Sequence, residues 1–343
     1  MVNDEQGLNE DTLVLDYLQQ AGITERLNRP GTTDVAINRP FEIWTDTPKG
    51  WMREDAPHLD YGLCWRVANS LSALNHRVLA PNTPIHTVEL PGGERGQLVM
   101  APACEKGTLS MTFRKPSLER FTLDDYIKSG RFDRAQAVAA PRVGLAPWQA
   151  QMKKAHKDRD WGRFFPQAVS YRQNIIIFGG PGSGKTTFGK MLMDLYPTNR
   201  RMLTIQEVYE LGLPYHPNNV HLFYGHVVTP KQLVASALRM KPDHLFLAEL
   251  TGDEVWHFIE ILNTGTKGTV TTAHANDSEA GYARVCGLVK QSEVGKGLDY
   301  SYIERLVRSS FDVVVYMEGT HILEVHYEPE HKLALLNRQM AAA

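Results

Sequence analysis

Apolar residues in this chain occur in short runs divided by glycine, proline and charged residues, as expected for a globular protein of strands and helices. In the first part of the chain, such runs predict strands at 35–38, 41–45, 50–52, 86–90, 96–101 and 109–114. Apolar positions at helical spacing predict helices at 9–21 and 61–74. Together these elements predict a smaller α+β domain over residues 1–128.

From residue 164 onward, strand patterns and helix patterns alternate. Buried strands are predicted at 174–178, 202–206, 222–224, 245–248 and 268–272, with helices between several of them. Two further runs at 312–317 and 321–327, joined through Glu318-Gly319-Thr320, predict a hairpin. The alternation is typical of an α/β nucleoside triphosphatase domain, which we place at residues 164–343.

The stretch between these regions, residues 129–163, has a different composition. Its first half is rich in alanine and proline, and its second half carries the run Lys153-Lys154-Ala155-His156-Lys157. We interpret it as a long linker that becomes helical in its second half. The basic run is interpreted first as a solvated helix face, and second as a contact with acidic lipid or nucleic acid.

Composition narrows the class of protein. A chain of 343 residues with 42% hydrophobic residues predicts two domains, or three, with substantial cores. The formal net charge of −2 argues against an overall basic field, and no apolar run is long enough to span a bilayer. The polar start shows no secretory signal, and three scattered cysteines argue against a disulfide framework or zinc site. We therefore expect a protein of the reducing cytoplasm.

One run of residues carries the strongest chemical signal. Gly179-Gly180-Pro181-Gly182-Ser183-Gly184-Lys185-Thr186 matches the phosphate-binding pattern G-x-x-x-x-G-K-[ST] at every required position. It lies between a predicted strand and a predicted helix, so backbone N–H groups and the helix dipole favour an anion there. Lys185 is expected to reach the β- and γ-phosphates, and the Thr186 hydroxyl to bind Mg²⁺. The predicted phosphate-binding residues are Gly180, Pro181, Gly182, Ser183, Gly184, Lys185, Thr186 and Thr187.

Three other strand ends supply candidate catalytic side chains. Glu249 follows the strand at 245–248; because Ala248 stands where an aspartate is usual, we expect Glu249 to orient water or to reach Mg²⁺ through water. Glu207 follows the strand at 202–206 and is a candidate base for the attacking water. His274 follows the strand at 268–272 and is a candidate contact on the γ-phosphate side. The alternatives are a solvated strand end for Glu249 and a local structural hydrogen bond for His274.

The order of these motifs resembles a known family. Residues 179–187, 203–211 (LTIQEVYEL), 238–250 (LRMKPD followed by LAEL) and 271–276 (TTAHAN) resemble the Walker A, Asp box, Walker B and His box of the type II/IV secretion ATPase superfamily. HPNNVHLFY at 216–224 is similar to the Vir-type traffic ATPases of type IV secretion and conjugation. GERGQ at 93–97 and FRKPS at 113–117 look like the N-terminal domain of that branch. The resemblance covers residues 33–325.

This resemblance implies a RecA-like ATPase domain preceded by an α+β domain, with ATP and Mg²⁺ bound between the two. It implies a homo-hexameric ring that hydrolyses ATP and energises pilus assembly or the transfer of DNA or protein. It also implies a cytoplasmic, peripheral position at the inner membrane, beside other secretion ATPases and channel subunits. Peripheral membrane contact and direct nucleic-acid binding are left open.

Two arginines are further candidates because the resemblance places the N-terminal domain over the nucleotide. Arg95 and Arg114 follow or end apolar strands of that domain. A guanidinium forks two phosphate oxygens and stabilises charge in the transition state. A contact made only on domain closure would couple domain motion to hydrolysis. The alternative is a surface arginine or a salt bridge.

The sequence departs from the family pattern at three places. Gln206-Glu207 stands where the family usually has Glu-Asp, so either Glu207 or Glu249 is the catalytic carboxylate. Thr251 stands where an arginine is usual, and Thr266-Lys267 where His-Pro is usual. These departures motivate a second hypothesis, a slow ATP-dependent regulatory switch that docks on secretion partners. A small-molecule kinase would leave the first 130 residues unexplained, and the net charge of −2 does not favour a nucleic-acid translocase.

Overall fold

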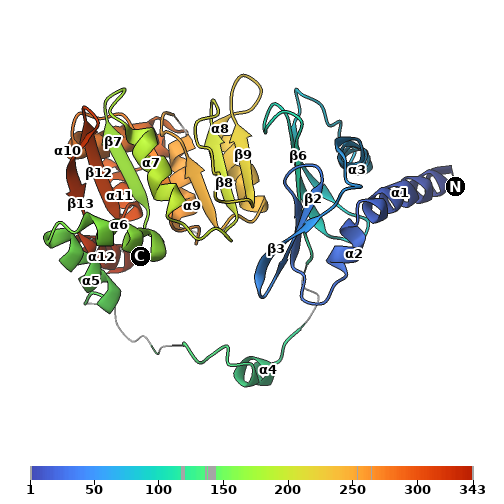
Figure 1. The fold of residues 1–343 in the computed structure, drawn as a ribbon, viewed down its shortest axis with the longest axis horizontal. Coiled ribbons are helices and arrows are strands. Elements are labelled where there is room, and N and C mark those ends of the chain that lie inside the picture. Colours follow the sequence, from blue (N-terminus) through green and yellow to red (C-terminus); the bar gives the residue numbers. More distant parts are fainter. Residues whose placement is uncertain are drawn as a thin grey trace.

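The N-terminal domain is an antiparallel sheet covered by helices on one face (Figure 1). The computed structural model describes residues 2–116, 120–135, 137, 144–252, 254–263 and 265–341. The six strands run in the order β3-β2-β1-β6-β5-β4. They are β1 (Asp34–Ile37), β2 (Glu42–Thr47), β3 (Gly50–Asp55), β4 (Ile85–Glu89), β5 (Arg95–Met100) and β6 (Leu109–Arg114). The helices are α1 (Val2–Gln20), α2 (Ile23–Leu27) and α3 (Tyr61–Leu74). The predicted elements are confirmed, and the short helix α2 was not predicted.

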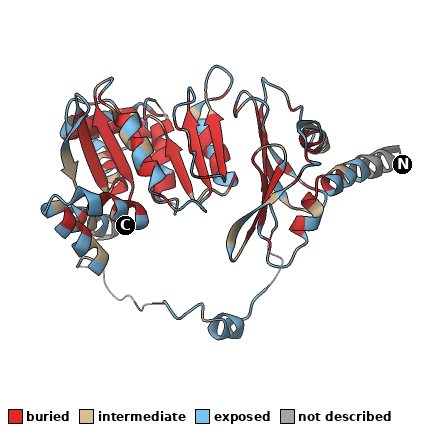
Figure 2. Cartoon of the chain, in the orientation of Figure 1, coloured by how far each residue is buried: buried red, intermediate tan, exposed pale blue. Residues whose placement is uncertain are grey.

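The second domain has a mainly parallel sheet between two layers of helices. Its strands are β7 (Ile175–Gly179), β8 (Met202–Gln206), β9 (Asn219–Phe223), β10 (His244–Leu247), β11 (Val270–Ala273), β12 (Val313–Glu318) and β13 (His321–His326). β12 and β13 form the predicted hairpin. Figure 2 shows β7 to β12 as the most buried part of this domain, as expected for strands covered on both faces, whereas the edge strand β13 is exposed or half-buried. The predicted α/β architecture is confirmed.

The helices divide between the two faces of this sheet. One hydrophobic core lies under α8 (Pro230–Arg239), α9 (Glu254–Asn263), α10 (Ser278–Gln291) and α11 (Tyr300–Ser310). The other lies under α5 (Pro147–Lys157), α6 (Trp161–Ser170) and α7 (Lys185–Asp194). A short 3₁₀ helix (Gly295–Gly297) follows α10, and α12 (Pro329–Ala341) packs beside α11.

Threonine hydroxyls join the two parts of the sheet. Backbone ladders connect β10-β8-β9 and, separately, β11-β7-β12-β13. Between β10 and β11, the hydroxyls of Thr269, Thr271 and Thr272 donate to the carbonyls of Leu245 (2.6 Å), Leu247 (2.7 Å) and Ala248 (2.8 Å). β10 and β11 are therefore neighbours, and the strands form one layer in the order β9-β8-β10-β11-β7-β12-β13.

The domain boundaries differ from the prediction. The packed N-terminal domain ends near β6, and α4 (Leu123–Lys128) lies in the linker. At the other end, the predicted linker to residue 163 is too long, because α5 and α6 pack on the ATPase domain. Met152 and Ala155 of α5 and Phe164 of α6 are buried in its core. The ATPase domain therefore begins near Pro147, and Lys153, Lys154 and Lys157 of the charged run lie on the exposed face of a packed helix.

The N-terminal domain docks on the edge strand β9 and on α8. The Phe223 N–H donates to the Ala103 carbonyl at 2.9 Å, and Cys104 forms an antiparallel bridge with Leu222. The Gln97 side chain donates to the Ser236 hydroxyl at 2.9 Å. These contacts cover the edge strand β9, whose backbone groups would otherwise be open to pairing with another chain.

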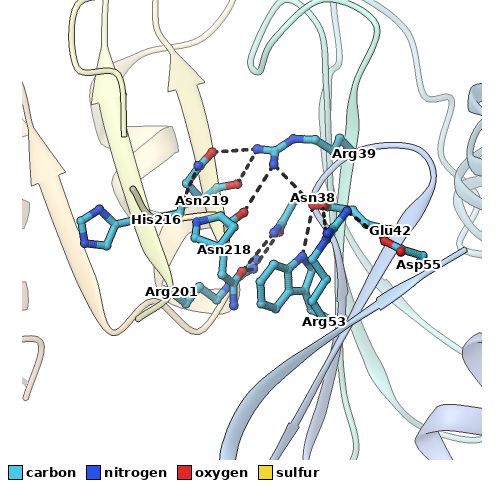
Figure 3. Close-up of polar contacts among 11 residues, drawn as sticks. Asn38, Arg39, Glu42, Arg53, Asp55, Arg201, His216, Asn218 and Asn219 are labelled. Carbon is cyan, nitrogen blue, oxygen red and sulfur yellow. Dashed lines mark hydrogen bonds and ion pairs between the residues drawn. The ribbon is translucent and has the colours of Figure 1, made fainter. Parts of the chain in front are cut away.

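A fully buried arginine lies at the centre of the domain interface (Figure 3). Arg201 donates to Asn38 Oδ1 (2.7 Å) and Thr112 Oγ1 (3.2 Å) of the N-terminal domain, and to Asn218 Oδ1 (2.6 Å) of the ATPase domain. Its guanidinium also lies over the Trp51 ring. No ion pair to Arg201 occurs in the part of the chain that the structure describes, so neutral acceptors from both domains satisfy its charge. Burial lowers the pKa of Arg201.

Candidate functional site

The predicted phosphate loop lies between the end of β7 and the start of α7. Gly182 (φ +70°) and Gly184 (φ +86°) adopt left-handed conformations that favour glycine. A side chain on Gly179 would overlap the Met317 carbonyl oxygen. Because α7 begins at Lys185, its first unpaired N–H groups face the loop. The loop therefore has the backbone geometry of an anion site.

Lys185 provides the positive charge of this site. Its Nζ donates to the carbonyl oxygens of Gly179 (2.9 Å) and Gly180 (2.7 Å) and lies 3.4 Å from His274 Nδ1. Burial lowers the pKa of Lys185, and the nearby Glu249 carboxylate acts in the opposite direction. An ammonium held mainly by neutral carbonyls in a buried position gains strongly from a phosphate.

His274 connects Lys185 to Glu249. His274 Nε2 lies 3.0 Å from Glu249 Oε1. Since Nδ1 accepts from the Lys185 ammonium, the ring hydrogen belongs on Nε2, which donates to the Glu249 carboxylate. Three side chains predicted from separate motifs thus form one hydrogen-bonded chain from the phosphate loop to the end of β10.

These side chains line a cavity of about 240 Å³. The cavity extends from the phosphate loop to the ends of β8, β9, β10 and β11. Its lining residues are Pro181, Gly182, Lys185, Thr186, Gln206, Glu207, Val208, Glu210, Tyr224, Ala248, Glu249, Thr272 and His274. Of the eight residues predicted in the phosphate site, Pro181, Gly182, Lys185 and Thr186 line the cavity. Gly180, Ser183, Gly184 and the exposed Thr187 are not among its lining residues.

Gln206 holds the loop that carries Glu207. Its Oε1 accepts the backbone N–H groups of Glu210 (2.8 Å) and Leu211 (2.7 Å), and its Nε2 donates to Thr204 Oγ1 (2.9 Å). Gln206 is buried, whereas Glu207 is exposed and lines the cavity. The glutamine that departs from the family pattern is therefore a positioning residue, and Glu207 remains available as a base.

We expect Gln206→Ala to lower stability and turnover together. Loss of the amide leaves two N–H groups of the loop without their acceptor, a cost of about 1–3 kcal/mol. Gln206→Glu separates the two roles of the amide, because a carboxylate still accepts both N–H groups but no longer donates to Thr204 Oγ1. Urea unfolding and phosphate release measure the two effects. Unchanged stability of Gln206→Ala would show that the loop does not depend on this side chain.

Carboxylates surround the side of the cavity near Tyr224. The pKa of Tyr224 is raised to about 12, first by burial and then by the charges of Glu207, Glu254, Glu249 and Glu210. This negative region would repel the phosphates of a nucleotide unless a cation lies between them. Lys185 and these carboxylates line the same cavity, so a cation bound with the nucleotide would offset the negative charge.

The donor set fits Mg²⁺ carried with a nucleotide. Among the described residues, no group of three or more His, Cys, Asp and Glu side chains could hold a metal ion. Mg²⁺ usually takes one or two protein oxygens together with phosphate oxygens and waters. Thr186 and Glu249 both line the cavity and provide such oxygens.

Arg95 and Arg114 lie outside this cavity, which corrects the expectation that the N-terminal domain covers the nucleotide of its own chain. The two arginines face each other across β5 and β6. Arg114 Nε donates to Asp34 Oδ1 at 2.9 Å, and Asp34 also pairs with Lys241. The like charges of Arg95 and Arg114 lie directly opposite each other, and Asp34 offsets that of Arg114. The domain that carries it docks on β9, away from the phosphate loop.

Sequence reasoning missed some of the residues around the site. Tyr224 and Glu210 were not singled out, although Tyr224 ends the strand predicted at 222–224 and Glu210 lies in the second motif. Glu254 was also missed: its Oε1 accepts the N–H groups of Thr251 and Gly252, both at 2.9 Å, and holds the turn after Glu249. The sequence did contain a sign of this role, because Glu254 lies three residues after Thr251, which is the spacing of a capping box.

The parallel sheet, the phosphate loop after β7 and the carboxylate at the end of β10 define a P-loop nucleoside triphosphatase. The chain matches the Type II/IV secretion system protein family over residues 149–321. The VirB11 protein of Brucella suis biovar 1 is 37% identical over 324 residues, which cover 90% of this chain and 89% of that protein. PtlH of Bordetella pertussis is 33% identical over 304 residues, covering 85% and 87%.

A solved structure agrees with these relatives. The crystal structure of the VirB11 ATPase from the Brucella suis type IV secretion system, in complex with sulphate, is 36% identical. It aligns with a TM-score of 0.92 and covers 97% of this chain and 99% of that one. The chain belongs to the Type II/IV secretion system protein family, and within it to the VirB11 group of type IV secretion ATPases. The predicted resemblance is confirmed.

Proposed function

We propose that this chain is the hexameric motor subunit of a type IV secretion system and converts ATP hydrolysis into movement of its domains. The observation that carries the proposal is the chain of contacts Lys185–His274–Glu249 across the cavity. It connects the group that binds phosphate with the group that orients water. The mass of the assembly in ATP and Mg²⁺, together with phosphate release, tests the proposal: six copies and turnover are expected.

Each residue of the site has a defined task in this mechanism. The loop N–H groups and Lys185 hold the β- and γ-phosphates, while the Thr186 hydroxyl faces Mg²⁺. Mg²⁺ supplies charge neutralisation on the phosphates when bound. Glu249 orients the attacking water, and Glu207 is a second candidate for its base. Because His274 contacts both Lys185 and Glu249, it responds to the charge on the γ-phosphate side.

The position of Arg95 and Arg114 supports a contact between subunits. Neither arginine lines the cavity of its own chain, so a contribution to hydrolysis must come from a neighbouring copy. A guanidinium supplied in this way contributes about 10³-fold or more in other phosphoryl-transfer enzymes. Hydrolysis in one subunit would then depend on the N-terminal domain of the next.

Mixing two inactive variants tests this arrangement. We expect Arg114→Ala to lower turnover sharply, and Arg95→Ala to do so less strongly, without unfolding the protein. A mixture of Arg114→Ala chains with Lys185→Ala chains should recover part of the turnover, because one chain supplies the arginine and the other the phosphate loop. Arg77→Ala, an exposed arginine of the same domain, is the control. Mixtures no more active than the separate variants would contradict a contact between subunits.

We place the motor at the inner face of the cytoplasmic membrane, in contact with other secretion ATPases and channel subunits. In the ranges that the structure describes, no helix combines the length and the apolar character needed to cross a bilayer. The transported substrate, DNA or protein, is set by those partners in this proposal.

A second candidate function is a slow regulatory switch. Gln206 and Thr251 favour it, because each replaces a charged residue of the family pattern. Turnover with and without anionic lipid vesicles separates the two candidates. Multiple turnovers per minute in either condition support a motor, and a single slow turnover with tight ATP retention supports the switch.

A further inference from the structure

A row of four charged side chains crosses one face of the N-terminal sheet. Arg114 of β6 lies opposite Arg95 of β5 on one side and opposite Asp34 of β1 on the other. Asp46 of β2 lies opposite Asp34 in turn. Side chains directly opposite each other in an antiparallel sheet share one face. The row therefore passes from two cations on β5 and β6 to two carboxylates on β1 and β2.

Lys241 of the ATPase domain binds the acidic end of this row. Its Nζ donates to Asp34 Oδ2 (2.5 Å), to Thr33 Oγ1 (2.9 Å) and to the Asp46 carboxylate. Burial lowers the pKa of Lys241, but hydrogen bonds to Asp34 and Asp46 outweigh this effect and raise the pKa, so the side chain stays an ammonium. One cation of the ATPase domain thus pairs with both carboxylates of the row.

The backbone at Lys241 indicates that this side chain has a specific use. Helix α8 ends at Arg239, Met240 caps it, and Lys241 follows with a φ of +53°. Glycine or asparagine usually takes the left-handed position after a helix, because a longer side chain raises the free energy of that conformation. A lysine at this position is unfavourable locally, and its contacts with the N-terminal domain offset the difference.

Asp34 binds Arg114 through only one of its two oxygens. Arg114 Nε donates to Asp34 Oδ1 at 2.9 Å, while Lys241 occupies Oδ2. Among the residues that the structure describes, the terminal nitrogens of Arg114 donate no hydrogen bond, and the side chain is 49% exposed. An arginine alone with a carboxylate commonly takes both oxygens in a bidentate pair. By occupying Oδ2, Lys241 leaves the terminal nitrogens of Arg114 free to fork two phosphate oxygens.

We propose that Lys241 and Asp34 are positioning residues for Arg114. While the two domains of the chain are docked, Lys241 holds Asp34 Oδ2 and Arg114 is bound through Nε alone. When the ATPase domain moves away, Oδ2 is released, and Arg114 closes on Asp34 as a bidentate pair and leaves the phosphate. The inference rests on the proposed role of Arg114 in hydrolysis. It adds that this arginine acts only while its own two domains are docked.

Lys241→Met in the full-length chain tests the positioning, because methionine keeps an unbranched side chain and removes the charge. We expect phosphate release at saturating ATP to fall about tenfold or more, a part of the about 10³-fold that such an arginine contributes. ATP retained on a filter should stay unchanged, and Lys241→Arg should keep most of the turnover. Lys231→Met, at an exposed lysine of α8, is the matched control and should hydrolyse ATP normally.

A second substitution distinguishes positioning from a simple loss of docking. Asparagine in place of Asp34 accepts from Arg114 Nε through its one oxygen but cannot form the bidentate pair. We therefore expect Asp34→Asn, added to Lys241→Met, to recover most of the lost turnover. If Lys241 only held the domains together, Asp34→Asn would remove a further contact. Turnover that stays low or falls further in the double variant would overturn the inference.

Comparison with Arg114→Ala separates this inference from the proposed function. Impaired Arg114→Ala together with normal Lys241→Met overturns the positioning alone. Normal turnover of Arg114→Ala removes the arginine from hydrolysis, and the inference falls with that role. Lys241→Met added to Arg114→Ala should lower turnover no further, because both changes act through one guanidinium; a further loss contradicts the inference. Urea unfolding checks the fold, and Lys241→Gln, neutral and more polar, replaces Lys241→Met with the same expected loss if that variant does not fold.

Discussion

Replacement of Lys185 by alanine is expected to reduce ATP turnover about a hundredfold or more. The Lys185 ammonium is the cation of the phosphate loop and neutralises charge on the transferring phosphoryl group. Its present hydrogen bonds go to two backbone carbonyls of the loop, and the glycines that shape the loop do not depend on it. Fold and assembly should therefore persist, and phosphate release under saturating ATP measures the loss.

Lys190→Ala is the matched control for this experiment. Lys190 lies on the same helix α7 but does not line the cavity. The Lys190→Ala variant should retain turnover. A loss of turnover confined to Lys185→Ala therefore identifies the phosphate site. Near-normal hydrolysis by purified Lys185→Ala would contradict the motor function.

Glu249→Gln is expected to retain ATP while slowing its hydrolysis by about a hundredfold or more, the scale of a lost general base or water-orienting group. A glutamine still accepts the hydrogen bond of His274, so the side chain stays in place while its negative charge is lost. ATP retained on a filter and single-turnover phosphate release measure binding and chemistry separately.

Glu207→Gln, compared under the same conditions, identifies the main base. The main base is the glutamate whose replacement slows single-turnover phosphate release more while ATP retention stays unchanged. Glu293→Gln, at an exposed site away from the cavity, is the control. Normal hydrolysis in both Glu249→Gln and Glu207→Gln would remove both carboxylates from the mechanism.

Local patterns predicted most of the fold. The strand runs and the helix at 61–74 appear where apolar periodicity placed them. The residues of the site could also be predicted, because their motifs lie at strand ends and parallel strands bring such ends to one edge of the sheet. Lys185, His274 and Glu249 are far apart in the sequence but meet for this reason.

Other features depend on contacts that no local pattern contains. α5 was assigned to the linker because lysines dominate its sequence, while only Met152 and Ala155 reach the core. The place of the N-terminal domain depends on Arg201, whose partners Asn38 and Asn218 lie on different domains. The arginines of β5 and β6 were expected over their own nucleotide because a single sequence does not distinguish one copy from its neighbour.

The shared arginine also constrains how this protein can evolve. Arg201 takes its acceptors from both domains, so a change at Asn38 or Thr112 in one domain alters the environment of a charge that belongs to the other. A recombination event that exchanged the N-terminal domain alone would leave the guanidinium buried without its full set of acceptors. We therefore expect an exchanged N-terminal domain to be tolerated only where it keeps the acceptors at positions 38 and 112.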